Sequence, residues 1–141
     1  GTNALIVGNP HYNGWMSQLS GAEGEARVIH EIIQGGADTN HQATMLLNAD
    51  ATKEAVLKHA DTANIIHLAS HGTQDGIYLS GRTCEEGKLT MAEVQSLSLN
   101  QTKMVVLSAC DTFKGDLLAD GVVGITRSFL VAGASTVMPV G

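Results

Sequence analysis

Two short apolar runs in this chain each lead into a chemically reactive side chain. Ile65–Leu68 is followed closely by His71, and Met104–Leu107 is followed closely by Cys110. A thiol that a neighbouring imidazole can deprotonate is a nucleophile, so this pair is the minimum apparatus for covalent cysteine catalysis. The backbone N–H groups of Gly72 and Cys110 could together bind the oxyanion that forms when a thiolate attacks a carbonyl group.

These two residues meet only if the runs before them are neighbouring strands. Both runs are short and rich in β-branched residues, which is typical of buried parallel strands. In open α/β sheets, sites form just beyond the carboxyl ends of the strands. We therefore expect His71 and Cys110 to face one another across a cleft at that edge of the sheet.

The rest of the chain alternates between strand-like and helix-like segments. Turns or loops are expected at 8–10, 82–88 and 108–121, and a small hairpin-like element at 77–79. This order predicts the α/β class, as a three-layer α/β/α sandwich whose mostly parallel central sheet has helices on both faces. The expected strands are Ala4–Val7, Thr44–Leu47, Ile65–Leu68, Met104–Leu107 and Ser135–Val140, and the expected helices are Ala22–Ile33, Lys53–Ala60, Leu89–Leu97 and Val122–Ala132.

Both candidate residues also have a purely structural interpretation. Cysteine is often buried in protein cores, so Cys110 could simply pack there. A lone histidine at the end of a strand, such as His71, usually bonds only to backbone. Asp111 and Asp116 would raise the pKa of the neighbouring thiol, and a histidine or a helix N-terminus would have to offset them. The occurrence of both residues at expected strand ends favours the catalytic interpretation.

Other reactive patterns have weaker support. His67 and His71 have the spacing of a helical zinc site, but their segment is a strand entering a turn. We therefore expect no metal site and a buried, hydrogen-bonded His67. Ser70 lies in a sequence similar to a nucleophile elbow, but Leu68 replaces the first glycine that the sharp turn requires. The glycines form neither a dinucleotide-binding pattern nor a phosphate loop, so we expect no cofactor.

The composition is that of a globular domain. The chain has 141 residues, 43% of them hydrophobic, and a formal net charge of −6. This charge argues against a nucleic-acid surface, and the apolar runs are far shorter than the roughly 18 residues of a membrane span. Cys84 and Cys110 do not resemble a disulfide framework, which favours the cytoplasm. We expect one domain over residues 1–141, excised from a longer chain whose C-terminal segment it could lack.

Three stretches carry a resemblance to a known family. They are His-Leu-Ala-Ser-His-Gly at 67–72, Leu-Ser-Ala-Cys-Asp-Thr at 107–112 and Gly-Val-Val-Gly-Ile-Thr-Arg-Ser-Phe-Leu-Val-Ala-Gly-Ala at 121–134. Together they resemble the CHAT domain, a caspase-like module often attached to tetratricopeptide repeats. The resemblance covers nearly the whole chain, because the family's first strand and three of its helices are similar to Ala4–Pro10, Gly21–Ile33, Ala51–Leu57 and Leu89–Leu97.

The resemblance implies a caspase-like fold with a Cys–His dyad. By position, His71 would be the base or acid and Cys110 the nucleophile, with the backbone amides of Gly72 and Cys110 as oxyanion donors. The implied activity is cleavage of a protein substrate through a thioester intermediate, with no cofactor. The implied partners are that substrate or another protein, and tetratricopeptide repeats would lie in the same parent chain.

The chain departs from the family just after the cysteine. Phe113 and Lys114 precede Gly115, whereas the family has glycines sooner, so the loop that would line the substrate groove is altered. An alternative function is therefore a catalytically inactive CHAT domain that acts as a protein–protein interaction scaffold. A flavodoxin-like domain that binds a small ligand is a third alternative, which rests on fold analogy only.

Acidic residues cluster near the expected nucleophile. Asp111, Asp116 and Asp120 follow Cys110 closely in the sequence. By charge complementarity, they predict a substrate with Lys or Arg immediately before the scissile bond.

Overall fold

A computed structural model describes residues 1–35, 40–108 and 118–140, with the side chains of residues 118–120 left out of the description. Strands and helices alternate through the first half of the chain and again at its end. The strands are β1 (Asn3–Pro10), β2 (Gln42–Asn48), β3 (Ile65–Ala69), β4 (Gly72–Thr73), β5 (Gly76–Tyr78), β6 (Lys88–Thr90), β7 (Met104–Ser108) and β8 (Val137–Pro139). The helices are α1 (Ser20–Gln34), α2 (Lys53–Ala60), α3 (Cys84–Gly87), α4 (Met91–Gln95) and α5 (Leu118–Val131).

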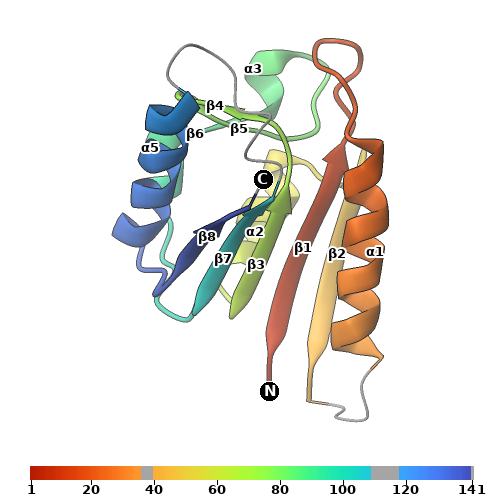
Figure 1. The fold of residues 1–141 in the computed structure, drawn as a ribbon, viewed down its shortest axis with the longest axis vertical. Helices are drawn as coiled ribbons and strands as arrows, with labels where there is room; N and C mark the ends of the chain where they lie inside the picture. Colours follow the sequence, from red (N-terminus) through yellow and green to blue (C-terminus); the bar gives the residue numbers. More distant parts are fainter. Residues whose placement is uncertain (36–39, 109–117, 141) are drawn as a thin grey trace.

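The main sheet has five strands in the order β2-β1-β3-β7-β8, and every neighbouring pair is parallel. A small antiparallel sheet, β4-β5-β6, follows β3 in the chain. Figure 1 shows this small sheet and α3 at the end of the molecule toward which the arrowheads of β1 and β3 point. The carboxyl ends of the main strands therefore lie beneath the β4-β5-β6 sheet, as expected for a site in an open α/β sheet.

Helices cover both faces of the main sheet. Alternate residues of β1, such as Leu5 and Val7, pack in the core with side chains of α2, α4 and α5. On the opposite face, Gly8 of β1 lies against Ala22 and Ala26 of α1. Right-handed crossovers in this strand order place α1 on one face and the later helices on the other. The three-layer α/β/α architecture with a mostly parallel sheet is therefore confirmed (Figure 1).

The core is one continuous cluster between the main sheet and the helices α2, α4 and α5. Its strands contribute mainly β-branched and leucine side chains, which suits a sheet buried on both faces. The largest members that are almost fully buried are Phe129, Leu5, Ile66, Ile77, Leu79, Leu89, Leu99 and Ile125.

The first strand runs past the turn expected at residues 8–10. β1 continues to Pro10, and its pairing with β2 shifts register between Gly8 and Pro10. Asn9 adopts a φ of 47°, which asparagine tolerates better than most residues. Pro10 has no N–H to donate, and it is tolerated here because it is the last residue of the strand, at a bulge.

The expected helix at Leu89–Leu97 is shorter in the structure. Thr90 caps α4 at its first turn, and Glu93 completes the capping box that its spacing predicts. Leu89 instead belongs to β6, because it pairs with Ile77 of β5. The charged segment expected as a loop at 82–88 contains α3, whose N-cap is Thr83.

The last helix starts earlier than expected. α5 begins at Leu118, inside the segment 108–121 that the sequence suggests is a loop, and Gly133 follows its end with a φ of 117°. Only glycine adopts this backbone conformation without strain, so the expected end of the helix is confirmed. In the described part of the chain, no helix is long and apolar enough to cross a membrane.

Candidate functional site

The ring of His71 is held by a backbone carbonyl group. His71 lies between β3 and β4 and is 3% exposed. Its Nε2 lies 2.7 Å from the carbonyl oxygen of Ser17 and 3.4 Å from Oγ of the same residue. A carbonyl oxygen only accepts hydrogen bonds, so Nε2 carries the hydrogen in the neutral ring. Nδ1 is then the nitrogen whose lone pair can take a proton.

The backbone of His71 is held by the hydroxyl group of Tyr12. The His71 N–H donates to Tyr12 Oη at 3.0 Å, and that hydroxyl donates to the Tyr78 carbonyl at 2.9 Å. The Tyr78 N–H donates to the His71 carbonyl at 2.9 Å. The hydroxyl thus replaces one rung of the ladder between the two segments. Burial raises the pKa of Tyr12 well above its usual value, so the hydroxyl remains a donor.

The direction in which the backbone N–H of Gly72 points follows from this pairing. Because His71 and Tyr78 form the hydrogen-bonded position, Gly72 and Ile77 form the non-hydrogen-bonded position next to it. At such a position the N–H group points away from the partner strand. The N–H of Gly72 is therefore directed away from β5, as an oxyanion donor next to His71 would have to be.

Aromatic side chains pack around the histidine. The rings of Tyr12 and His71 are 5.4 Å apart, and Trp15 packs edge-on against Tyr12 at 5.0 Å. Trp15 also donates from Nε1 to the Gly81 carbonyl at 2.8 Å, which ties the loop after β1 to the segment after β5. Nothing in the sequence of this loop pointed to a role beside His71. Its only signal was the position of the one tryptophan, and the contact of Ser17 with His71 requires the tertiary fold.

The strand that leads to Cys110 is next to the strand that leads to His71. β3 and β7 are parallel neighbours, and Ala69 pairs with Ser108. Cys110, Asp111 and Asp116 lie outside the described residues, and the side chain of Asp120 in α5 is not described. The structure therefore brings together His71 and Gly72 among the predicted site residues, and the roles of the others stay predictions.

His67 is buried on the face of β3 that is covered by α1, opposite the core face covered by α2, α4 and α5. Its Nε2 lies 2.9 Å from Oε1 of Glu25, and Oγ of Ser108 donates to the same oxygen at 2.9 Å. Burial lowers the pKa of His67 from 6.5, and the Glu25 carboxylate acts in the opposite direction. The buried His67 that the sequence predicts is confirmed. His67 and His71 contact different partners, and in the described ranges no three acidic, histidine or cysteine side chains converge as metal ligands.

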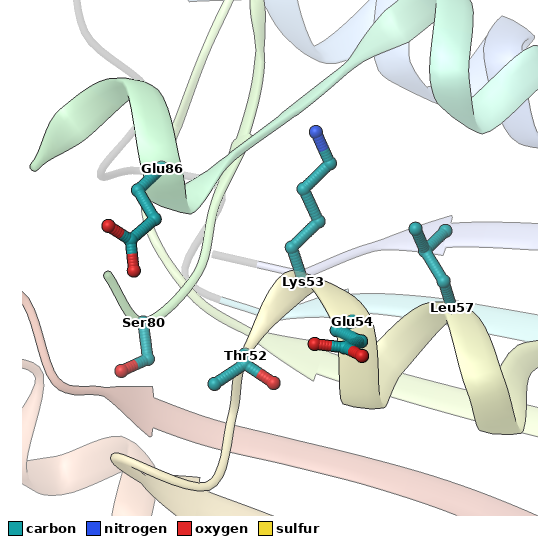
Figure 2. Close-up of a pocket in the computed structure, with 6 residues that line it drawn as sticks. All are labelled: Thr52, Lys53, Glu54, Leu57, Ser80 and Glu86. Carbon is teal, nitrogen blue, oxygen red and sulfur yellow. The ribbon is translucent and has the colours of Figure 1, made fainter. Parts of the chain in front are cut away.

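A cavity of about 380 Å³ lies beside the start of α2. Figure 2 shows side chains of this first turn facing Ser80 and Glu86. Most of its polar groups already have partners: Thr52 caps α2, Ser80 donates to the His11 carbonyl, and Lys53 pairs with Glu93 at 2.6 Å. The described lining includes neither His71 nor Gly72, so we assign no chemistry to this cavity.

Comparison with known proteins identifies relatives of the chain. The sequence profile of the family described as "CHAT domain" matches residues 1–139. Tetratricopeptide repeat protein 28 of Homo sapiens is 25% identical over 181 residues, which covers 96% of this chain and 7% of that protein. The protein of the same name from Mus musculus is 26% identical over 183 residues, covering 97% of this chain and 7% of that protein. The chain thus spans a small fraction of these relatives' length.

Proposed function

Because the chain belongs to the CHAT domain family, we propose that it is a caspase-like cysteine endopeptidase domain that cleaves protein substrates with a Cys110–His71 dyad. The observation that carries the proposal is the register of the two strands that precede these residues. Ala69 pairs with Ser108, so His71 and Cys110 each follow this pair by two positions. Neighbouring strands are about 4.8 Å apart, which is a suitable starting separation for a thiol and an imidazole.

The environment of His71 supports the role of a base. The Ser17 carbonyl holds Nε2–H, so Nδ1 is the nitrogen that would take the proton of the Cys110 thiol. The thiolate would attack the scissile carbonyl carbon, and the N–H groups of Gly72 and Cys110 would donate to the resulting oxyanion.

The remaining steps return the enzyme to its starting state. The C–N bond breaks as the His71 imidazolium gives its proton to the leaving amine, which leaves a thioester on Cys110. His71 then takes a proton from water, and the hydroxide hydrolyses the thioester. The proton finally returns to the thiolate. In this scheme the Ser17 carbonyl orients the imidazole, a task that a carboxylate side chain performs in other proteases.

The pH dependence of Cys110 alkylation by iodoacetamide tests the proposal. Every protein carries Cys84→Ser, so that Cys110 is the only thiol. We expect alkylation below pH 7 in this background and a shift of the profile toward the ordinary cysteine value of about 8.5 in His71→Ala. His59→Ala is the matched control, because it removes a histidine that lies in the last turn of α2 and is not part of the proposed dyad.

Two outcomes of this experiment have different meanings. A profile that is the same with and without His71 would exclude the dyad. A shifted profile justifies a substrate screen, in which Cys110→Ala should abolish cleavage while the unfolding transition stays the same. Cleavage that persists in Cys110→Ala would exclude this residue as the nucleophile.

Substrate preference is a separate part of the proposal. We propose that Asp111, Asp116 and Asp120 favour a substrate with Lys or Arg before the scissile bond, by charge complementarity. A peptide library should show this preference, and it should weaken in Asp120→Asn. A library profile without enrichment of basic residues would remove this part and leave the dyad unaffected.

A second candidate is an interaction module without catalysis. Apolar side chains gather on the exposed surface of α5 and at the edge strand, where Leu130, Val131 and Met138 are 46%, 62% and 45% exposed. Such patches often mark contact sites for other proteins. The named relatives are tetratricopeptide repeat proteins, and we propose that such repeats also accompany this chain in its parent protein. An ordinary pH profile of Cys110 alkylation that does not change in His71→Ala would favour this candidate.

A further inference from the structure

One carboxylate joins α1 to both strands that precede the proposed dyad. Oε1 of Glu25 accepts a hydrogen bond from Oγ of Ser108 at 2.9 Å and lies 2.9 Å from Nε2 of His67. Ser108 is the last residue of β7, and His67 lies in the middle of β3. The two side chains are therefore held by a single oxygen atom that belongs to a third element.

We propose that Glu25 is a positioning residue, which fixes the carboxyl ends of β3 and β7 relative to each other through His67 and Ser108. This inference rests on the proposed function, because the purpose of the alignment is to set the separation of His71 and Cys110. Proton transfer between a thiol and an imidazole depends on sub-ångström placement of both groups.

The segment of α1 that carries Glu25 packs tightly against β1. Ala26, the next residue of α1, is fully buried, and a Cβ atom added at Gly8 would lie 2.8 Å from its side chain. The helix therefore packs directly against the backbone of β1 at Gly8. The charged residues of α1 closest to Glu25 in the sequence are Glu23 and Arg27. Nη2 of Arg27 lies 3.6 Å from Oε2 of Glu23, and Glu23 also accepts a hydrogen bond from Asn48 of β2, so this pair contacts a different strand.

The position of the contact along the strands gives it an effect on the site. Backbone pairing between β3 and β7 ends at Ala69 and Ser108. The last hydrogen bonds of a ladder open more readily than those in its middle, because fewer neighbours hold them. A side-chain contact to Ser108 restrains the ladder at this point, two positions before Cys110.

Two substitutions of Glu25 separate hydrogen bonding from charge. In Glu25→Gln, the amide oxygen can still accept from Ser108 and lie next to Nε2 of His67, so alignment should persist without the negative charge. In Glu25→Ala, both contacts are lost. Glu23→Ala is the matched control, because it removes a carboxylate of the same helix that contacts β2 instead.

The first readout is the pH profile of Cys110 alkylation in the Cys84→Ser background. We expect Glu25→Ala to move the midpoint upward by about one pH unit, toward the profile of His71→Ala. Glu25→Gln and Glu23→Ala should retain the parent profile. A purely structural role of Glu25 would lower the unfolding temperature without moving this midpoint, and that result would overturn the proposal.

The second readout does not depend on catalysis. Backbone amide hydrogen exchange of peptides that contain the carboxyl ends of β3 and β7 should be roughly tenfold faster in Glu25→Ala than in Glu23→Ala. Unchanged exchange would overturn the positioning role whether or not the dyad exists. A third outcome is faster exchange in Glu25→Ala together with an alkylation profile that does not change in His71→Ala. This result would contradict the proposed function and leave the structural link of Glu25 intact.

Discussion

At the scale of single residues, the site depends on backbone groups as much as on side chains. His71 is held through its ring by the Ser17 carbonyl and through its backbone N–H by Tyr12. A backbone carbonyl oxygen has no ionisable proton, so the contact at Nε2 does not depend on the charge state of its partner. The single hydroxyl of Tyr12 is the more vulnerable link, because it satisfies two backbone groups at once.

Tyr12→Phe should therefore destabilise the protein. The substitution leaves the His71 N–H and the Tyr78 carbonyl without their buried partner, which costs about 1–3 kcal/mol in the free energy of unfolding. Urea denaturation measures this loss. Tyr78→Phe is the control, since its hydroxyl lies 2.9 Å from the side-chain oxygen Oγ1 of Thr73 and does not bridge the two backbone groups that Tyr12 joins. Equal stability losses in the two variants would contradict the bridging role of Tyr12.

His67 should make stability dependent on pH. Its pKa is lower in the folded chain than its ordinary value of 6.5, mainly because of burial. The unfolded chain therefore binds more protons as the pH falls through this value, and the stability that neutral His67 contributes is complete above about pH 6.5 and lost below it. We expect the free energy of unfolding to fall more steeply between about pH 7.5 and 5.5 in the parent than in His67→Gln. Parallel curves would contradict the assignment.

At the scale of elements, close contact between α1 and β1 sets the position of Glu25. The contact needs a residue without a side chain at Gly8, because an added Cβ would lie 2.9 Å from the Ala22 carbonyl oxygen as well as close to Ala26. Gly24 lies in the same helix and has open space around it. The two glycines thus serve different purposes, and only the first is required by packing.

Replacement of each glycine by alanine should have opposite effects. Gly8→Ala should lower the free energy of unfolding by about 1–3 kcal/mol, because α1 must move away from the sheet. Gly24→Ala should raise the free energy of unfolding by about 0.5–1 kcal/mol. Alanine has less conformational freedom than glycine in the unfolded chain, and its Cβ atom meets no neighbour in the folded helix. Chemical denaturation of both variants measures these changes, and a stabilised Gly8→Ala would exclude the tight contact.

At the scale of the whole molecule, acidic charge and exposed apolar residues act against each other. The net charge is −6 at pH 7, and the isoelectric point from the sequence is about 5.3. Several large apolar side chains are exposed, among them Ile32 of α1 at 71% and Val131 of α5 at 62%. Charge repulsion between molecules disappears near the isoelectric point, so these residues are then free to associate.

Light scattering should accordingly rise as the pH approaches about 5.3. The double variant Ile32→Glu and Val131→Glu should scatter less at any fixed distance in pH from its own isoelectric point, because it exposes a smaller apolar surface. The substitutions should barely change the unfolding midpoint, since both side chains are exposed. Equal scattering by the two proteins at matched net charge would show that these residues do not drive association.

The alternation of apolar strands and amphipathic helices was readable from the sequence, because burial on a sheet or on one helix face imposes a period on the residues. The succession of strands and helices along the chain and the capping box at Thr90 followed from the same local signals, whereas the order of the strands across the sheet came from the structure. His71 stood out because a reactive side chain follows a buried strand directly. The length of β1, the strand β6 and the shortened α4 did not follow, because each depends on pairing with a segment distant in the chain.

Local patterns of residues are therefore sufficient to predict the class of fold, the family and the strand ends at which chemistry is expected. The groups that surround these strand ends are visible only in the folded chain: the Ser17 carbonyl on the ring of His71, the Tyr12 hydroxyl between His71 and Tyr78, and the Glu25 carboxylate between β3 and β7. These contacts join residues more than forty positions apart, as in Ser17 and His71 or Glu25 and Ser108. Local periodicity records which face of an element is buried, but it does not record which distant group lies against it.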